Sequence, residues 1–278
     1  MNEQQGRGLI SGMILRLEAS SENRASIHRY NNSEDHYPFN VFLETLEINV
    51  QQNDAIECLF TAWRDLYERL INCFIEGPKT DFSYMRVVRN HYHISPKALG
   101  ITGSGRGYNK AQYTRELSQW HLPSILAGMI HDHINRDIKR GIFEYPTTMT
   151  KKQFHKLVYE KSLLLLDSQK WRCSYTDVLM TIEKSWTRFS FERIDNDLPH
   201  FTQAGDLTNI VFICRLLNGN PQFSRAKILT YLLHQPMVQV PFNVRQQARS
   251  EIDQLLRKEG DEEKRLKVLG QINLIGRF

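Results

Sequence analysis

Residues 171–220 read WRCSYTDVLMTIEKSWTRFSFERIDNDLPHFTQAGDLTNIVFICRLLNGN and decide what the second half of the chain can form. Two short runs within them, 191–194 and 209–213, are rich in the aromatic and β-branched residues that favour strands. The polar loop between these runs contains residue types that are typical of turns, namely Asn196, Asp197, Pro199 and Gly205. We therefore expect a long β-hairpin in this stretch.

A helix follows the hairpin in the sequence pattern. Residues 221–233 place apolar side chains at helical spacing, at Phe223, Ile228, Leu229 and Leu232. Strand, strand and helix then form one small unit that can hold a metal ion between the first strand and the helix.

The order of short motifs in this stretch resembles that of the HNH endonuclease family, whose core is called ββα-metal. The matching motifs are Cys173-Ser174-Tyr175-Thr176, then Ser190 through Asp195, then Asn209 before an apolar run, and finally Cys214 through Asn218. The resemblance implies a divalent cation that is bound by the acidic residue of the second motif and by the last residue of the fourth. In this sequence those residues are Glu192 and Asn218.

The resemblance also implies the reaction, which is hydrolysis of a phosphodiester bond of DNA. Carboxylate and amide oxygens suit a hard cation, so we expect one Mg²⁺ or Mn²⁺ ion. Such an ion can bind the scissile phosphate and stabilise the leaving oxygen. Asn209 matches the middle asparagine of the family, which holds the loop and the catalytic side chain in place by hydrogen bonds.

Arg193 departs from the family pattern, because most members have at this position the histidine that deprotonates the attacking water. An arginine stays protonated at physiological pH and cannot act as an ordinary general base. We expect Arg193 instead to bind the phosphate and to offset charge in the transition state. The general base is then another group: His200, whose ordinary pKa of about 6.5 suits the task, Tyr175, or a residue elsewhere.

The cysteine spacing bears on a second metal. Many family members bind a structural zinc through paired Cys-x-x-Cys motifs, but residues 173–176 and 214–217 contain one cysteine each. We therefore expect no structural zinc, and we expect apolar packing in its place. The four cysteines are scattered and no apolar signal segment opens the chain, so we expect an intracellular protein without disulfides.

The rest of the chain has mainly helical patterns, at 54–75, 123–139, 151–166, 243–256 and 262–274. Residues 1–38 mix one apolar stretch, 9–17, with the polar run 20–36, and we expect them to be frayed or loosely attached. We expect an α+β protein in three parts: a mainly helical DNA-contacting domain over 1–150, the HNH unit over 151–240 and a helical extension over 241–278. No apolar run reaches the roughly 20 residues of a membrane span.

A basic segment, residues 82–115, is the expected nucleic-acid surface of the first part. It contains no acidic residue and combines cations for phosphates with rings for stacking. Its candidate contacts are Arg86, Arg89, Lys97, Arg106, Tyr108 and Lys110. The same composition also fits a plain solvated surface. His131 and His133 lie two apart on an expected helix and so face different ways, which argues against a shared metal.

The function expected from the sequence is metal-dependent cleavage of DNA. The excess of 36 basic over 31 acidic residues mildly favours a polyanionic partner. Two alternatives stay open. One is an HNH-fold DNA-binding reader that no longer cleaves, because the usual histidine is missing, and the other is an RNA-directed nuclease, which the tyrosine-rich basic segment permits. A reaction that needs a pair of cuts would favour a homodimer.

Overall fold

The computed structural model describes residues 4–18, 23–31, 34–49, 59–77, 122–182, 185–218, 223–260 and 268. The chain forms two compact units. Unit 1 comprises Met1–Lys79, Tyr175–Val178 and Leu216–Phe278, and unit 2 comprises Thr80–Ser174 and Leu179–Arg215. Helices and two-stranded sheets occur together, so the fold is a mixed α+β one, as the sequence predicted.

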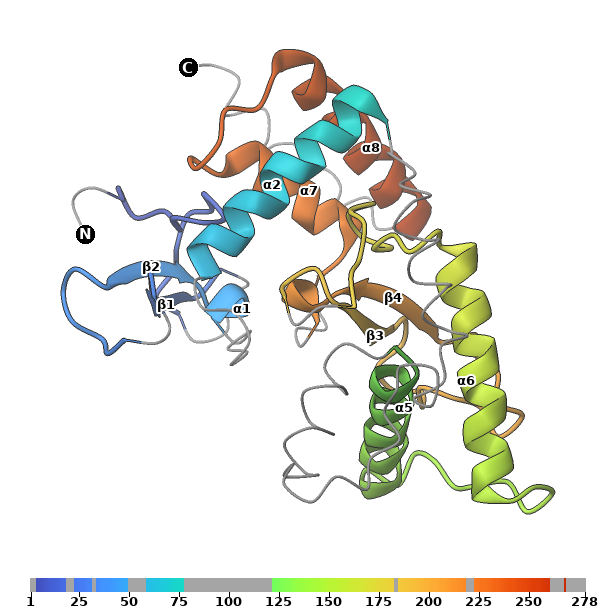
Figure 1. The fold of residues 1–278 in the computed structure, drawn as a ribbon. Helices are drawn as coiled ribbons and strands as arrows, with labels where there is room; N and C mark the ends of the chain where they lie inside the picture. The colour runs from blue at the N-terminus through green and yellow to red at the C-terminus, as the bar shows by residue number, and fades with distance from the viewer. Residues whose placement is uncertain are drawn as a thin grey trace, which may run out of the picture. The chain divides into compact units, whose positions relative to one another are not determined.

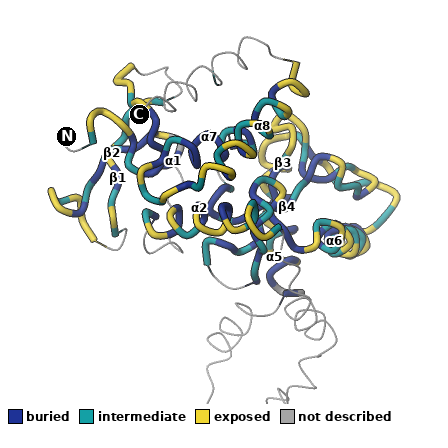
Figure 2. Tube along the Cα trace, turned by 90° about the horizontal axis from the view of Figure 1, so that it is seen from above, coloured by how far each residue is buried: buried dark blue, intermediate teal, exposed yellow. Residues whose placement is uncertain are grey.

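Three helices form the main body of unit 1: α2 (Leu59–Glu76), α7 (Arg225–His234) and α8 (Phe242–Glu259) (Figure 1). α8 packs against both α2 and α7. In the core of this unit the ring of Trp63 packs against two other rings. Its centroid lies 5.8 Å from that of Phe223 and 6.2 Å from that of Tyr231. α7 is buried along most of its length (Figure 2), which explains why its sequence is apolar on more than one side.

The N-terminal part of unit 1 corrects the prediction that residues 1–38 are loosely attached. β1 (Ala25–Arg29) pairs antiparallel with β2 (Val41–Thr45), and the short helix α1 (Leu46–Asn49) follows. The buried carboxylate of Glu44 accepts hydrogen bonds from the backbone N–H groups of Ile10, Ser11 and Thr45. A buried polar anchor of this kind leaves no trace in a hydrophobic pattern, which is why the sequence did not reveal it.

Unit 2 contains α5 (Leu122–Lys139), α6 (Lys151–Ser168) and a hairpin of β3 (Phe189–Arg193) and β4 (Ile210–Cys214) (Figure 1). The two strands are antiparallel, which confirms the predicted hairpin. α5 packs against α6, and α6 contacts β4. The short 3-10 helix η1 (Arg215–Leu217) follows β4.

Aromatic rings hold the hairpin of unit 2 in its register. Phe191 lies opposite Phe212, and their ring centroids are 4.6 Å apart. Phe201 contacts Phe191 edge-on, at 5.6 Å between centroids. The side-chain amide of Gln169 accepts from the backbone N–H of Phe212 and donates to its carbonyl oxygen, at 2.9 Å each. Gln169 thereby covers the outer edge of β4, and the register fixes which residues share each face.

Helix ends follow local chemistry. α2 stops before Gly77, whose φ of 73° is left-handed and favours glycine at this position. Thr150 and Gln153 form a capping box at the start of α6. Ser224 caps α7 through its side chain. Such signals are local in sequence, so the helix limits were predictable.

The structure confirms the predicted helices that fall within the described residues. They correspond to α2, α5, α6, α7 and α8. The first part of the helix predicted at 54–75 and nearly all of the one predicted at 262–274 lie outside the described residues.

The predicted domain limits, 1–150, 151–240 and 241–278, do not coincide with the two units. The reason is that α8 packs against both α2 and α7, so the C-terminal helices belong with an N-terminal one. β3 and β4 belong to unit 2 and α7 to unit 1, so the expected strand-strand-helix unit stays a prediction. None of the helices in the described ranges has both the length and the apolar character that a membrane span requires.

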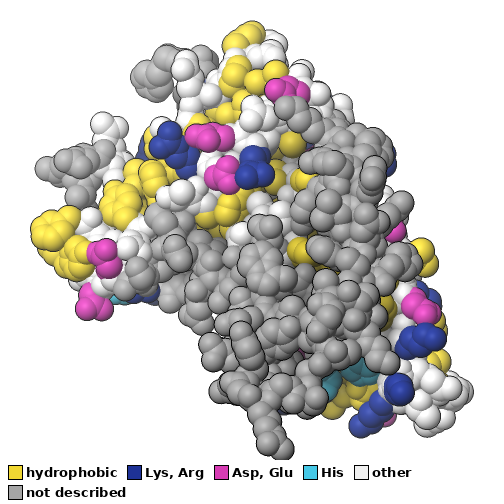
Figure 3. Space-filling view, in the orientation of Figure 1, with side chains coloured by type: hydrophobic (Ala, Val, Ile, Leu, Met, Phe, Trp, Pro, Cys, Tyr) yellow, Lys and Arg dark blue, Asp and Glu magenta, His cyan; other side chains and the backbone are white. Residues whose placement is uncertain are grey.

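The outer face of α2 carries charges of both signs. Arg64 pairs with Glu68 at 3.2 Å and Arg69 with Asp65 at 3.1 Å, each pair four residues apart. Figure 3 shows positive and negative side chains side by side over this helix. Exposed pairs of this kind contribute about 0.3–0.5 kcal/mol each. This face is therefore an ordinary solvated surface, and substitutions on it are suitable controls.

Replacing Gly12 by alanine is expected to lower the free energy of unfolding by roughly 2–5 kcal/mol, as the sum of a left-handed backbone penalty and of overpacking. Gly12 has a φ of 67°, and a Cβ there would lie 2.0 Å from the carbonyl oxygen of His234. Gly6 is the matched control, because its φ is 70° and a Cβ there would meet nothing within 4 Å. Denaturant unfolding of the two variants checks this, and equal losses would contradict the close approach.

Candidate functional site

The motif residues of the hairpin meet where β3 ends and β4 begins. Glu192 and Arg193 are the last two residues of β3, and Asn209 immediately precedes β4. The ladder continues one step beyond the strands, because the backbone N–H of Ile194 donates to the carbonyl oxygen of Asn209 at 3.0 Å. Antiparallel pairing thus brings together three residues that the resemblance to the HNH family singled out.

Asn209 holds the loop between the strands. Its Oδ1 accepts from the backbone N–H of Asp195 at 2.8 Å, and its Nδ2 donates to the carbonyl oxygens of Asp195 at 2.9 Å and Pro199 at 3.0 Å. The side chain is buried, so these bonds are shielded from water. This geometry suits an orienting residue, and a part in catalysis stays a prediction.

Glu192 is the buried acid of the hairpin, with 7% of its surface exposed. Across the residues that the structure describes, its carboxylate makes no hydrogen bond and no ion pair. Burial raises the pKa of Glu192 to about 7, and the charge of Arg193 offsets only part of that rise. A buried carboxylate without a partner is costly, and a bound cation would supply the partner.

Arg193 turns back onto the loop. Its Nη1 donates to the carbonyl oxygens of Asn196 at 2.7 Å and Leu198 at 3.2 Å. Within the described residues its Nε and Nη2 make no hydrogen bond, so they keep their donors for an anion. Because side chains alternate along a strand, Arg193 shares the face of Phe191, and Glu192 lies on the opposite face.

His200 is buried rather than solvated, with 6% of its surface exposed. Its Nδ1 lies 2.8 Å from Oδ2 of Asp137, and its backbone N–H donates to the same oxygen at 2.6 Å. Its Nε2 lies 2.7 Å from Nδ1 of His133 on α5. Both ring nitrogens of His200 are therefore engaged, and neither is open to water while these bonds hold.

The hydrogen bonds that link Asp137, His200 and His133 determine which ring nitrogen of each histidine carries a hydrogen. The carboxylate of Asp137 accepts from Nδ1–H of His200, which leaves Nε2 of His200 to accept from Nδ1–H of His133. At the outer end, Nη2 of Arg136 lies 3.0 Å from Nε2 of His133. The ring of His133 also meets that of Phe191 edge-on, at 5.3 Å between centroids. The chain thus ties α5 to the loop that follows β3.

The pKa values agree with two neutral imidazoles and one carboxylate. Burial, and then the charges of His200, Arg136 and Arg193, lower the pKa of His133 to about 2. Burial also lowers the pKa of His200, although Asp137 opposes this. For Asp137, burial alone raises the pKa, but the hydrogen bonds from His200 outweigh it and lower the pKa.

Sequence reasoning missed Asp137, and it considered His133 only as a metal ligand. The two residues are four apart on α5 and therefore share one face of the helix, which is the signal that could have found them. His131 and His133 do face different ways, since His131 is exposed and His133 is buried. The partner of both residues, His200, is 63 residues from Asp137 in sequence, and no local pattern reports such a contact.

Other predicted site residues lie elsewhere. Tyr175 and Asn218 belong to unit 1, whereas Glu192 belongs to unit 2, so a shared cation between Glu192 and Asn218 stays a prediction. The carbonyl oxygen of Tyr175 accepts from Arg225 at 3.1 Å. The nucleic-acid contacts predicted in the segment 82–115 lie outside the described residues, namely Arg86, Arg89, Lys97, Arg106, Tyr108 and Lys110.

The described side chains show which groups could hold a metal. Cys173 and Cys214 are both buried, and the backbone N–H of Cys214 donates to Sγ of Cys173 at 3.3 Å. In the described part of the chain, no three His, Cys, Asp or Glu side chains gather as a metal site. A cation at Glu192 would therefore complete its ligands with amide or carbonyl oxygens, water and phosphate, a set that Mg²⁺ commonly accepts.

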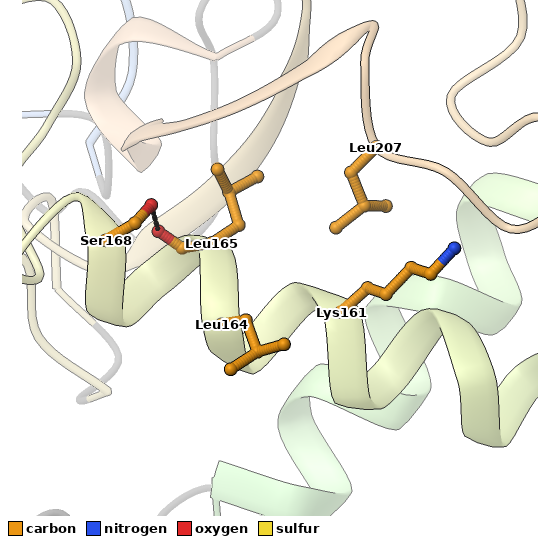
Figure 4. Close-up of a pocket in the computed structure, with 5 residues that line it drawn as sticks. All are labelled: Lys161, Leu164, Leu165, Ser168 and Leu207. Atoms are coloured by element: carbon orange, nitrogen blue, oxygen red, sulfur yellow. Dashed lines mark hydrogen bonds between the residues drawn. The ribbon is translucent and has the colours of Figure 1, made fainter.

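An apolar hollow on α6 is separate from these residues. It is lined by Lys161, Leu164, Leu165, Ser168 and Leu207 (Figure 4). The hydroxyl of Ser168 donates to the carbonyl oxygen of Leu165 at 2.8 Å, and the ammonium of Lys161 binds Asp206 at 2.6 Å. Its polar groups are thus used within the protein, and none of the predicted site residues lines it.

Comparison of the chain with family models, with curated proteins and with solved structures gives no match. The resemblance to HNH endonucleases therefore rests on the motif residues alone.

Acid is expected to destabilise the protein through His133. The unfolded chain takes up a proton near the ordinary pKa of about 6.5. The folded chain does so only near pH 2, because the pKa of His133 is lowered to about 2. Between pH 7 and pH 5 this group alone lowers the free energy of unfolding by about 2 kcal/mol. Urea unfolding measures this effect. Between pH 7 and pH 5 the free energy of unfolding of His133→Gln should fall by about 2 kcal/mol less than that of the wild type, whereas that of His131→Gln should fall as much as in the wild type. If the free energy of unfolding of His133→Gln falls as much as that of the wild type between pH 7 and pH 5, His133 is not held neutral in the folded protein.

Glu192 is expected to give the stability a pH dependence of the opposite sign to that from His133. Its pKa is raised from 4.5 to about 7, so its contribution to stability is present at low pH and is lost as the pH rises through 7. In the presence of EDTA, Glu192→Gln should exceed the wild type at pH 8 by about 3 kcal/mol and match it at about pH 4, below the pKa of the unfolded chain. Denaturant unfolding at both pH values measures this. The exposed acid Glu68, changed to Gln, is the control, and equal behaviour of the two variants would show that Glu192 is not a strained buried acid.

Proposed function

We propose that the protein is a metal-dependent endonuclease that hydrolyses phosphodiester bonds of DNA. The observation that carries this proposal is Glu192, a buried carboxylate without a protein partner among the described residues, at the position where the HNH resemblance expects a metal ligand. Buried groups with perturbed pKa values gather at functional sites, because folding alone gains nothing from them.

Four residues of the matching motifs have separate parts in this proposal. Glu192 binds the cation through its carboxylate, and Asn218 is the second ligand that the resemblance implies. A bound Mg²⁺ or Mn²⁺ ion supplies Lewis-acid stabilisation of charge on the phosphate and on the leaving oxygen. Asn209 keeps the loop in one conformation, and Arg193 offers its remaining guanidinium donors to a phosphate.

His200 has a positioning role in this scheme. Its ring is bound on one side to Asp137 and on the other to His133, so it fixes the loop from within the protein. To accept a proton from water it would first have to release His133. This engagement favours the second candidate function, a DNA-binding reader that does not cleave.

Cleavage of plasmid DNA with Mg²⁺ or Mn²⁺, with the product ends mapped, tests the proposal. Glu192→Gln should lower the cleavage rate on the order of a hundredfold or more, because it removes a charged ligand, whereas Glu68→Gln should not. Asn218→Ala should also abolish cutting. Cleavage by Glu192→Gln at the wild-type rate would overturn the metal site.

Arg193→Ala separates binding from catalysis. Its contact is proposed to strengthen in the transition state, so the cleavage rate should fall on the order of a hundredfold while the affinity for DNA in EDTA stays nearly constant. An equal loss of both would assign Arg193 to ground-state binding.

The same assays decide between the candidate functions. DNA binding that persists in EDTA, with no cleavage under either metal, would establish the reader. A preference for a matched RNA duplex over the DNA duplex would establish an RNA-directed protein.

A further inference from the structure

Two arginines lie close to the buried ring of His133. Arg136, three residues further along α5, places its Nη2 3.0 Å from Nε2 of His133. Arg193 shares the face of Phe191 on β3, and the ring of Phe191 meets that of His133 edge-on at 5.3 Å between centroids. The charges of both arginines also lower the pKa values of His133 and His200. One guanidinium from α5 and one from β3 thus lie beside the same neutral imidazole.

Both guanidinium groups keep donors for a ligand that approaches from solvent. Arg136 is exposed and Arg193 is half-buried, so neither is enclosed by the protein. Within the described residues, Nη1 of Arg136 and both Nε and Nη2 of Arg193 make no hydrogen bond, and neither arginine has an ion pair. Because guanidinium groups keep their charge in proteins, two accessible cations lie beside a ring that carries no charge.

The acidic residues of this region offset only part of the positive charge. Asp137 is buried, and its carboxylate accepts hydrogen bonds from the ring and from the backbone N–H of His200. Asp195 accepts from the backbone N–H of Asp197. Across the described ranges, neither of these two acids forms an ion pair with an arginine of the pair, and Asp132 on α5 forms none either. An anion from solution can therefore supply the charge that the protein lacks here.

The buried hydrogen bonds behind Arg136 determine how this arginine is held. The carboxylate of Asp137 accepts from Nδ1–H of His200, so Nε2 of His200 accepts from Nδ1–H of His133. Nε2 of His133 is then an acceptor, and the guanidinium of Arg136 donates to it. Arg193 is held by two carbonyl oxygens of the loop that leads to His200. One loop and its buried histidine thus fix both guanidinium groups.

We propose that Arg136 and Arg193 bind one phosphate group between them. The buried residues Asp137, His200 and His133 act as positioning residues for Arg136. A guanidinium fork matches the oxygens of phosphate in geometry and charge. Two such forks match a phosphate with two negative charges better than a diester with one.

This preference gives Arg136 a part in the proposed reaction. A phosphodiester has one negative charge, and its transition state for attack by hydroxide carries more. Arg136 therefore joins Arg193 in stabilising the charge that develops during hydrolysis. This last step rests on the proposed function, whereas the phosphate site itself does not.

Titration of the full chain with inorganic phosphate tests the site, in EDTA at pH 8 and constant ionic strength, followed by NMR of the arginine side chains. Arg136→Gln and, separately, Arg193→Gln should each bind phosphate at least about tenfold more weakly than the wild type. Arg64, an exposed arginine paired with Glu68, is changed to Gln as the control and should leave the affinity unchanged. Dimethyl phosphate, which has one charge, should bind more weakly than phosphate. Loss of affinity in neither variant, or in only one of them, would overturn the shared site.

Asp137→Asn tests the positioning role. Asparagine can donate to Nδ1 of His200, which reverses the hydrogen bonds and leaves a hydrogen on Nε2 of His133, facing Arg136. The ¹⁵N shifts of the imidazole rings report this reversal, and a folded variant that shows it should bind phosphate more weakly. If Asp137→Asn does not fold, His133→Phe removes the same acceptor and should give the same loss. Wild-type affinity in a folded variant without the acceptor would contradict the positioning role.

Cleavage of plasmid DNA tests the part of Arg136 in the reaction. Arg136→Gln should lower the rate on the order of tenfold or more while the affinity for DNA in EDTA stays nearly constant. An unchanged rate in a variant that no longer binds phosphate would exclude this part. If the wild type itself does not cleave, the proposed function fails, and the phosphate titration still decides whether the two arginines share a site.

Discussion

The register of β3 against β4 is the constraint on which the candidate site depends. Phe191 and Phe212 stack across the two strands, and Gln169 holds the outer edge of β4. A slip of one residue would exchange the two faces of the hairpin, so that Glu192 would take the place of Phe191 against the aromatic core. Burial of three phenylalanines on one face thus decides where the acid lies.

The two faces of the hairpin differ in chemistry. On the face of Phe191 the rings pack together, and the polar atoms of Asp137, His200 and His133 satisfy one another. The face of Glu192 carries a buried acid whose pKa is raised to about 7 and which has no partner among the described residues. Proteins keep unfavourable groups of this kind where a ligand relieves them. A cation is the ligand that we propose for this face.

Much of the fold could be predicted from local sequence signals. The end of α2 follows from Gly77 and the start of α6 from the capping box of Thr150, and the hairpin follows from its β-prone runs. β1 and β2 could not be predicted, because their anchor is the buried Glu44. Nor could the membership of the units, which depends on helix packing between distant parts of the chain.

The candidate site, too, combines residues that local sequence signals identify with residues that only tertiary packing brings in. The motifs placed Glu192, Arg193 and Asn209, which are close in the structure because strands pair. His133 and Asp137 join His200 only through tertiary packing, and the sequence therefore pointed to a single loop histidine instead of a buried chain.

The most direct test of this account is a titration with Mn²⁺ at pH 8, in which the free ion is followed by its electron paramagnetic resonance signal. The wild type should bind one ion, and Glu192→Gln should bind it at least about tenfold more weakly, since an uncharged amide replaces a carboxylate ligand. Equal affinity in the two proteins would contradict a cation site at Glu192.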